Sequence, residues 1–209
     1  MNREPFEIDD AKELAAMDRV LAIQRAAHLN EPCASEAQRR ARLDRLLRMI
    51  KSNRAAIEAE ISADFGGRSD VETLAFETLS CVEEIRHTLK HLRRWMRPQR
   101  RPVALSTWPA RASVLRQPLG VIGIIVPWNY PLYLAVSPIV GAMGAGNRIM
   151  VKMSEHAPRF SRLFADLVAE TFREDEVFVV TGGASWPRPS PRRRSTTCSS
   201  PGRPPWGAT

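Results

Sequence analysis

The stretch from Leu119 to Glu155 constrains the fold of this 209-residue chain more than any other part of the sequence. It holds an apolar run, a Pro-Trp-Asn-Tyr-Pro turn, a second apolar run that ends in glycines, and a third apolar run that carries one lysine and one glutamate. The first and third runs are short and rich in β-branched residues, which is typical of buried strands. A strand, a helix and a second strand in this order predict a parallel βαβ unit with a right-handed crossover.

The same alternation continues after this stretch. An amphipathic helix is expected from Pro158 to Phe172, and a third short strand from Val177 to Val180. The first strand, Val121 to Val126, carries no charge and is predicted to be buried on both faces. We therefore predict an α/β fold with a Rossmann-like parallel sheet.

The first 100 residues are predicted to form helices that support this sheet. Ser35 and Gln38 have the spacing of a capping box at a helix start, and Pro98 ends the last helix. His87 and His91 are four residues apart on that helix, and we interpret them as two exposed imidazoles without a third ligand. No metal site is expected.

Composition limits the class of protein. The net charge is +8, but the arginines after Ser185 supply +5 of it with no acid among them, which leaves about +3 for the rest. This distribution argues against a nucleic-acid-binding body. Three cysteines make neither a disulfide framework nor a zinc site. We see no secretory leader and no apolar run long enough for a membrane span, so a cytoplasmic protein is expected.

Polar side chains are expected at one edge of the sheet. Ligands of parallel α/β sheets bind past the carboxyl ends of the strands, where Asn129 follows the first strand and Lys152 and Glu155 follow the second. A lysine and a glutamate there can hold the hydroxyls of a sugar, and an asparagine amide can stabilise an oxygen that gains negative charge. By spacing alone, Lys152 and Glu155 could equally be ordinary loop charges.

The glycines of the central stretch do not supply a nucleotide fingerprint. Gly141, Gly144 and Gly146 do not form G-x-G-x-x-G, and they end a helix instead of following a strand. We interpret them as positions of close packing and as a helix C-cap.

Two runs of sequence carry a family resemblance. The run from Gln117 to Leu132 and the run from Gly146 to Glu155 closely resemble the aldehyde dehydrogenase family, and within it the coniferyl-aldehyde type. Asp64–Ser69 and the helical run His91–Met96 are also similar to that group. The resemblance covers about residues 10 to 184, and its Pro-Trp-Asn-x-Pro motif is specific.

The resemblance implies roles for matching residues. Asn129 corresponds to the asparagine whose amide helps hold the thiohemiacetal oxyanion, and Lys152 and Glu155 correspond to the pair that contacts the adenosine ribose. The turn that borders the cofactor corresponds to Ile125, Pro127 and Trp128. The implied activity is NAD(P)-dependent oxidation of an aldehyde to the acid. An aromatic aldehyde, similar to coniferyl aldehyde, is one candidate substrate. A glutamate at position 155 suits free ribose hydroxyls, so NAD is expected and NADP is the alternative.

The resemblance also implies what this chain lacks. Family members attack the aldehyde with a cysteine thiolate and use a glutamate as general base, and both lie downstream of the matching region. We expect Cys33 and Cys81, placed in helices, and Cys198 to be inert. The chain is therefore expected to be a truncated, inactive fragment. The alternative is a non-catalytic remnant that keeps dinucleotide binding or subunit pairing. The intact enzyme is expected to be a homodimer, with no nucleic-acid or membrane partner.

The composition changes abruptly after Ala184. Residues 185–209 are rich in proline, arginine and serine and are expected to be a disordered basic tail. A sharper hypothesis is that a frameshift produced this tail. When Ser195–Thr209 are written in GC-rich codons that we chose, and the bases are read from one position earlier, the product contains Phe-Thr-Gly-x-x-x-x-Gly. This run resembles the family's next glycine motif. The predicted organisation is a helical region (1–100), a β-hairpin that resembles the family's oligomerisation element (101–118), a partial dinucleotide-binding domain (119–184) and this tail.

Overall fold

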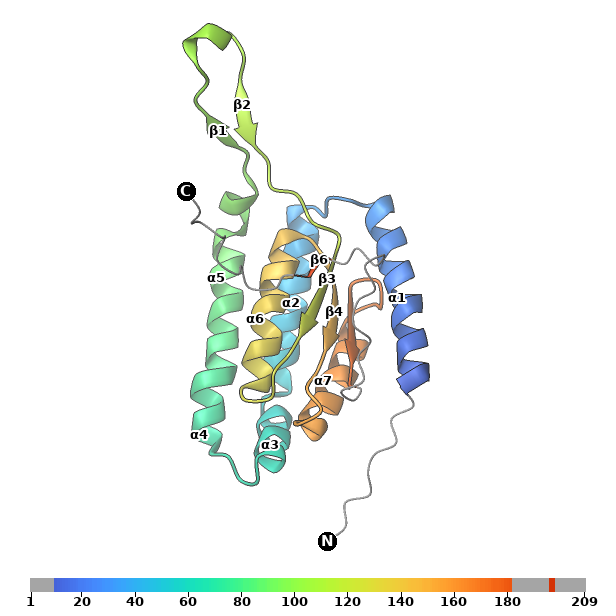
Figure 1. The fold of residues 1–209 in the computed structure, drawn as a ribbon. Coiled ribbons are helices and arrows are strands. Elements are labelled where there is room, and N and C mark those ends of the chain that lie inside the picture. Colours follow the sequence, from blue (N-terminus) through green and yellow to red (C-terminus); the bar gives the residue numbers. More distant parts are fainter. Residues whose placement is uncertain (1–9, 182–195, 198–209) are drawn as a thin grey trace, which may run out of the picture.

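The computed structural model describes residues 10–181 and 196–197. Within these residues, helices pack against a parallel sheet, so the predicted α/β class is confirmed (Figure 1). The larger helices are α1 (Asp10–Asn30), α2 (Glu36–Ser52), α3 (Arg54–Asp64), α5 (Leu79–Met96), α6 (Pro131–Ala145) and α7 (Pro158–Thr171). The sheet has the strand order β5-β4-β3-β6 and consists of β3 (Val121–Ile125), β4 (Arg148–Lys152), β5 (Val177–Val180) and β6 (Thr196–Thr197).

The sheet lies between α1 on one side and α2, α5 and α6 on the other (Figure 1). The central core is formed by apolar side chains of α2, α5 and α6 together with inward residues of the strands and α7. Phe160 and Phe164 of α7 are fully buried, with ring centroids 5.7 Å apart. The strands predicted from β-branched runs therefore share one core with the helices predicted from apolar spacing.

The start of α2 forms as the sequence predicts. The Ser35 hydroxyl accepts a hydrogen bond from the Gln38 N–H, and the Gln38 side chain accepts one from the Ser35 N–H. This reciprocal pair satisfies N–H groups that have no partner inside the helix. Asn53 separates α2 from α3, because the chain turns there before the apolar face resumes.

The helix that follows Ser69 contains a π-helical turn. Its first turn is α4 (Asp70–Thr73), the π-helical segment η1 covers Leu74–Thr78, and α5 continues to Met96 without a break. A π turn widens the helix by one residue per turn and re-aims the side chains that it carries. Here it carries Glu77, which is fully buried.

A two-stranded hairpin projects from the helical body (Figure 1). Its strands are β1 (Gln99–Arg101) and β2 (Ala112–Val114), which pair antiparallel, and the short 3-10 helix η2 (Leu105–Thr107) lies between them. Leu105 and Trp108 at its tip are largely exposed.

The prediction that the first sheet strand is buried on both faces is wrong. In β3, Ile122 and Ile124 are buried, whereas Gly123 and Ile125 are exposed. Successive side chains of a strand point to opposite faces, and although both α6 and α1 contact β3, Gly123 and Ile125 on one of these faces stay exposed. Ile125 stays 66% exposed at the end of the strand.

The expectation of a disordered tail is corrected at two residues. Thr196 and Thr197 form β6, which pairs parallel with Ile122 and Gly123 of β3. The outer edge of β3 offers backbone N–H and C=O groups for pairing, and threonine has a high β propensity. The rest of residues 185–209 lies outside the described part of the chain.

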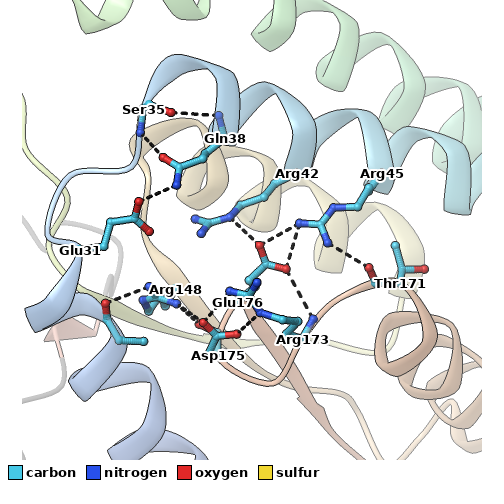
Figure 2. Close-up of polar contacts among 11 residues, drawn as sticks. Glu31, Ser35, Gln38, Arg42, Arg45, Arg148, Thr171, Arg173, Asp175 and Glu176 are labelled. Atoms are coloured by element: carbon cyan, nitrogen blue, oxygen red, sulfur yellow. Dashed lines mark hydrogen bonds and ion pairs between the residues drawn. The ribbon is translucent and has the colours of Figure 1, made fainter.

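An amino-edge cluster of charged residues joins the helices to the sheet (Figure 2). We define it as Arg42 and Arg45 of α2, Arg148 of β4, and Asp175 and Glu176 of the loop before β5. The Glu176 carboxylate accepts from Arg42 Nε at 3.0 Å and from an Arg45 nitrogen at 2.8 Å. Arg148 donates to the Asp175 carboxylate at 2.8 Å and to the backbone oxygen of Ala27 at 3.0 Å, which ties α1 to the same edge.

Candidate functional site

The carboxyl ends of β3 and β4 lie side by side. The two strands run parallel, with Ile125 opposite Lys152 in the ladder. The N–H of Val126 donates to the Lys152 carbonyl at 2.9 Å, so the pairing continues to the first residue of the turn. The two groups of predicted site residues therefore meet at one edge of the sheet.

Lys152 and Glu155 form a pair at this edge. Lys152 is buried, and its Nζ donates to the backbone oxygen of Met153 and to Glu155 Oε2, both at 3.1 Å. The Glu155 side chain is 36% exposed. Its own backbone N–H lowers the pKa of the Glu155 carboxyl, burial opposes this, and Lys152 lowers it further. The result is an anionic acceptor that is exposed beside a cationic donor, which suits the hydroxyls of a sugar.

The turn after β3 presents Trp128 and Asn129 to solvent. Trp128 is 53% exposed and stacks on Phe65, with ring centroids 6.1 Å apart and planes inclined by 28°. Asn129 and Tyr130 line a groove of about 400 Å³ together with Trp128 and Phe65. Pro127 is exposed at the start of the turn. The structure therefore brings the predicted turn residues together on the open surface of this edge.

Arg68 contacts the turn from the loop after α3. Its guanidinium lies 4.8 Å from the Phe65 ring centroid and 4.5 Å from the Tyr130 ring centroid. One of its nitrogens donates to the backbone oxygen of Asn129 at 3.1 Å and to the Glu77 carboxylate at 3.1 Å. Its other nitrogens bind Glu72. Sequence reasoning did not assign a role to Arg68, although it lies within the run Asp64–Ser69 that carries the resemblance.

Glu77 caps the start of α6. Its Oε2 accepts from the backbone N–H of Leu132 at 2.8 Å and of Tyr133 at 3.2 Å. Burial raises the pKa of the Glu77 carboxyl, and the two N–H groups and then Arg68 oppose that effect. The pattern of α5 alone could not identify this residue, because its burial depends on a π turn and on a helix more than fifty residues away.

Asp64 does the same for α7. Its carboxylate accepts from the backbone N–H of Arg159 at 3.1 Å and of Phe160 at 2.9 Å. The crossover helices α6 and α7 thus each have an acidic cap, from Glu77 of η1 and from Asp64 at the end of α3.

The cysteines occupy two unlike places. Cys81 is buried in α5, and burial raises the pKa of its thiol. Cys33 is exposed in the loop before α2, so the prediction that it lies in a helix is wrong, because the helix has ended before Pro32. Cys198 lies outside the described residues. The rings of His87 and His91 lie 4.2 Å apart between centroids with their planes inclined by 35°, and in the described part of the chain no three His, Cys, Asp or Glu side chains are placed to share a metal ion.

Comparison with known sequences finds relatives of this chain. The model of the aldehyde dehydrogenase family matches residues 7–187. The chain is 46% identical over 172 residues to a probable coniferyl aldehyde dehydrogenase of Pseudomonas aeruginosa, a match that covers 82% of this chain and 36% of that protein. It is 41% identical over 170 residues to a coniferyl aldehyde dehydrogenase of a Pseudomonas species, with 81% and 34% covered. The chain thus spans about a third of the length of these relatives.

Solved structures agree on the fold. The structure described as the substrate-bound state of Staphylococcus aureus AldH matches with a TM-score of 0.77 at 27% identity, over 80% of this chain and 36% of that chain. A succinic semialdehyde dehydrogenase of Streptococcus pyogenes, in complex with NADP+, matches with a TM-score of 0.71 at 18% identity, over 88% and 38%. Among the described residues, no helix has the length and apolar character needed to cross a membrane. With the family model matching most of its length, this chain belongs to the aldehyde dehydrogenase family.

Proposed function

We propose that the carboxyl edge of this sheet binds the dinucleotide of an NAD(P)-dependent aldehyde dehydrogenase. The observation that carries the proposal is the pair of Lys152 and Glu155 at the end of β4, beside the turn that ends β3. In this proposal the pair holds the hydroxyls of the adenosine ribose. The residues that border the cofactor are Ile125, Pro127 and Trp128.

NAD is the proposed cofactor, with NADP as the alternative. An acidic side chain at the end of the second strand accepts from free ribose hydroxyls, whereas a 2′-phosphate would bring negative charge against it. The lowered pKa of Glu155 keeps this carboxylate charged at neutral pH. The NADP+ complex of the Streptococcus pyogenes neighbour makes a direct comparison of the two cofactors necessary.

The proposed reaction of the intact enzyme is oxidation of an aldehyde to the acid. Asn129 would donate its side-chain amide to the oxyanion of the adduct, which is the role that needs a fixed N–H donor at the place where charge develops. The two Pseudomonas relatives are named for coniferyl aldehyde, which favours an aromatic aldehyde as the substrate. A homodimer in the cytoplasm, without nucleic-acid or membrane partners, completes the proposal.

This chain alone is proposed not to oxidise aldehydes. The thiol of Cys81 is buried and has a raised pKa, so it is a poor nucleophile. Cys33 lies at the edge of the sheet opposite to Asn129. Arg39 shows this, because it donates both to the carbonyl of Ala34, next to Cys33, and to the carbonyl of Gly144 near the end of α6.

Titration of the full chain with NAD+ and NADP+ by calorimetry tests the cofactor proposal. We expect saturable NAD+ binding that weakens at least tenfold in Lys152→Ala and in Glu155→Gln, and weaker NADP+ binding. Lys90→Ala, which changes an exposed lysine on α5, is the matched control and should bind as the parent does. Equal affinity in Lys152→Ala and Lys90→Ala would contradict the assigned ribose site.

Two further measurements test the proposals on activity. Absence of NADH formation from an aromatic aldehyde by the pure chain is expected, and NADH formation would show that a nucleophile is present. If NAD+ binds without turnover, the chain acts as a non-catalytic remnant. The proposed change of reading frame after Ala184 places the coding for the nucleophile and base in another frame of the gene, and the gene sequence tests it.

A further inference from the structure

The turn that carries Asn129 is held by a buried ion pair from a distant part of the chain. Arg68 and Glu77 bind each other at 3.1 Å, and their side chains are 9% and 0% exposed. Both also bind the backbone around Asn129, which is more than fifty residues further along the chain. Neither residue belongs to the proposed ribose site.

Arg68 fixes the first side of this segment. It donates to the backbone oxygen of Asn129, and its planar guanidinium is held near the Phe65 and Tyr130 rings. An arginine held by stacking and by ion pairs loses little further freedom when it makes one more hydrogen bond. The Asn129–Tyr130 peptide group therefore meets a donor that is already oriented.

Glu77 fixes the other side. It accepts from the N–H groups of Leu132 and Tyr133, three and four residues after Asn129. The π turn of η1 places its carboxylate there, and π turns are frequent where a helix serves a functional site. Rotation of the Asn129 backbone would thus break a hydrogen bond on one side or strain the cap on the other.

We propose that Arg68 and Glu77 are positioning residues that set the orientation of the Asn129 amide. The proposal rests on the proposed role of Asn129 as the oxyanion donor. Such a donor acts only if it is oriented before the charge develops, and supporting residues outside the contact with substrate provide that orientation. Arg68 and Glu77 act through the backbone of the turn, so neither touches the reacting atoms.

Selective ¹⁵N-asparagine labelling tests this in the full chain, which has five asparagines. The side-chain amide signal that disappears in Asn129→Asp is assigned to Asn129. In Arg68→Met and in Glu77→Gln, we expect that signal to shift or to broaden into several, while the signals of Asn53 and Asn147 stay at their parent positions. Gln at position 77 keeps an acceptor oxygen and nearly the same volume, so this variant is the milder of the two.

Asp64→Asn is the matched control. It weakens the equivalent acidic cap on α7, and the hydrogen bonds of the Asp64 carboxylate go to the backbone of α7 and not to that of the turn. A merely structural role predicts that Asp64→Asn and Glu77→Gln lower the unfolding midpoint alike and that both leave the Asn129 signal unmoved; that result overturns the proposal. Arg68→Lys keeps the charge without the planar fork, so it should restore the Asn129 signal only in part.

Addition of NAD+ to the same samples separates the two proposals. If NAD+ shifts no signal, but Arg68→Met still displaces the Asn129 signal, the cofactor proposal fails and the positioning role stands. If NAD+ binds and the Asn129 signal is the same in the parent, Arg68→Met and Glu77→Gln, the positioning role fails and the cofactor proposal stands.

Discussion

The two edges of the sheet use buried charge in different ways. At the amino edge, the Glu176 carboxylate is held by Arg42 and Arg45, and its side chain is only 7% exposed. At the carboxyl edge, the carboxylate of Glu155 is bound by Lys152 yet remains partly open to solvent. The first edge therefore holds elements together, whereas the second retains donors and acceptors that are open to solvent.

The pKa of Glu155 is lowered like that of Glu176, but the two fully or largely buried carboxyls, Glu176 at the amino edge and Glu77 at the carboxyl edge, shift in opposite directions. Burial raises the pKa of Glu176, but Arg45 and Arg42 outweigh it and the pKa is lowered overall. For Glu77 at the carboxyl edge, burial dominates and the pKa is raised despite two backbone N–H groups. A carboxylate whose pKa is lowered stabilises the fold in its charged form. A carboxylate whose pKa is raised destabilises the fold when it is charged, and such groups are often found at functional sites.

The largest effect is expected from Glu176→Ala. Removal of this carboxylate leaves the buried Arg42 without its ion-pair partner, and breaking one partner of a buried pair costs about 3–5 kcal/mol. Urea unfolding followed by circular dichroism measures the loss. Glu174→Gln is the control, because the Glu174–Arg19 pair is about half exposed on both sides and should contribute far less. Equal losses in the two variants would remove the distinction between buried and surface pairs.

A smaller loss is expected from Gly146→Ala at the same edge. Gly146 has φ +86° at the end of α6, and an added Cβ would lie 2.7 Å from the Arg39 guanidinium. The positive φ and the displaced arginine together should cost roughly 1–3 kcal/mol. Gly141→Ala on the same helix is the control, because no atom lies within 4 Å of its added Cβ. Thermal unfolding of both variants gives the comparison, and similar midpoints would argue against strain at Gly146.

A third effect is acid lability of the amino edge. Arg173 first, and Arg148 in addition, hold the pKa of Asp175 at about 2. Because the pKa is depressed in the folded state, the stabilisation is present above pH 4 and is lost as the pH falls from about 4 to 2. After solvent screening we expect roughly 1 kcal/mol from this group. Asp175→Asn should flatten the dependence of unfolding free energy on pH in that range, and an unchanged slope would show that other carboxylates set it.

The smallest effect on stability is expected at the carboxyl edge. Lys152→Met keeps the apolar stem of the buried side chain and removes its charge, and the Glu155 carboxylate that loses its partner can still reach water. The free energy of unfolding should change by less than about 1 kcal/mol, while NAD+ affinity falls. Chemical unfolding and calorimetry on the same preparation check both results. A large loss of stability in this variant would make the two edges alike.

Local pattern was enough to predict much of the fold. The bounds of β5 follow from a short β-branched run, and the start of α2 follows from Ser35 and Gln38, because these signals lie within a few residues of each other. The strand ends then placed Lys152 and Glu155 at the same edge as the turn after β3. The exposure of Ile125 was not predicted, because an apolar sequence does not tell which face another element covers.

Contacts between distant segments account for what the sequence did not reveal. The Arg42–Glu176 pair joins residues 134 positions apart, and the Arg68 contact with Asn129 joins residues 61 apart. Arginine and glutamate on an amphipathic helix usually lie in solvent, so their pattern gives no sign of burial. The π turn that delivers Glu77 is equally invisible, since its sequence reads as an ordinary helix.

The acidic caps on α6 and α7 have a consequence for how a dinucleotide can lie on this edge. In many doubly wound sheets, phosphate binds at a helix N-terminus, where free N–H groups and the helix dipole attract an anion. Here Glu77 and Asp64 already supply the anion at both helices. A pyrophosphate there would compete with a carboxylate of the protein, so in the proposed site we expect neither crossover helix to bind it. A glycine-rich turn lets phosphate approach the backbone closely, and such a turn is not needed after β3 if phosphate does not bind there. The sequence after β3 is Pro-Trp-Asn-Tyr-Pro instead.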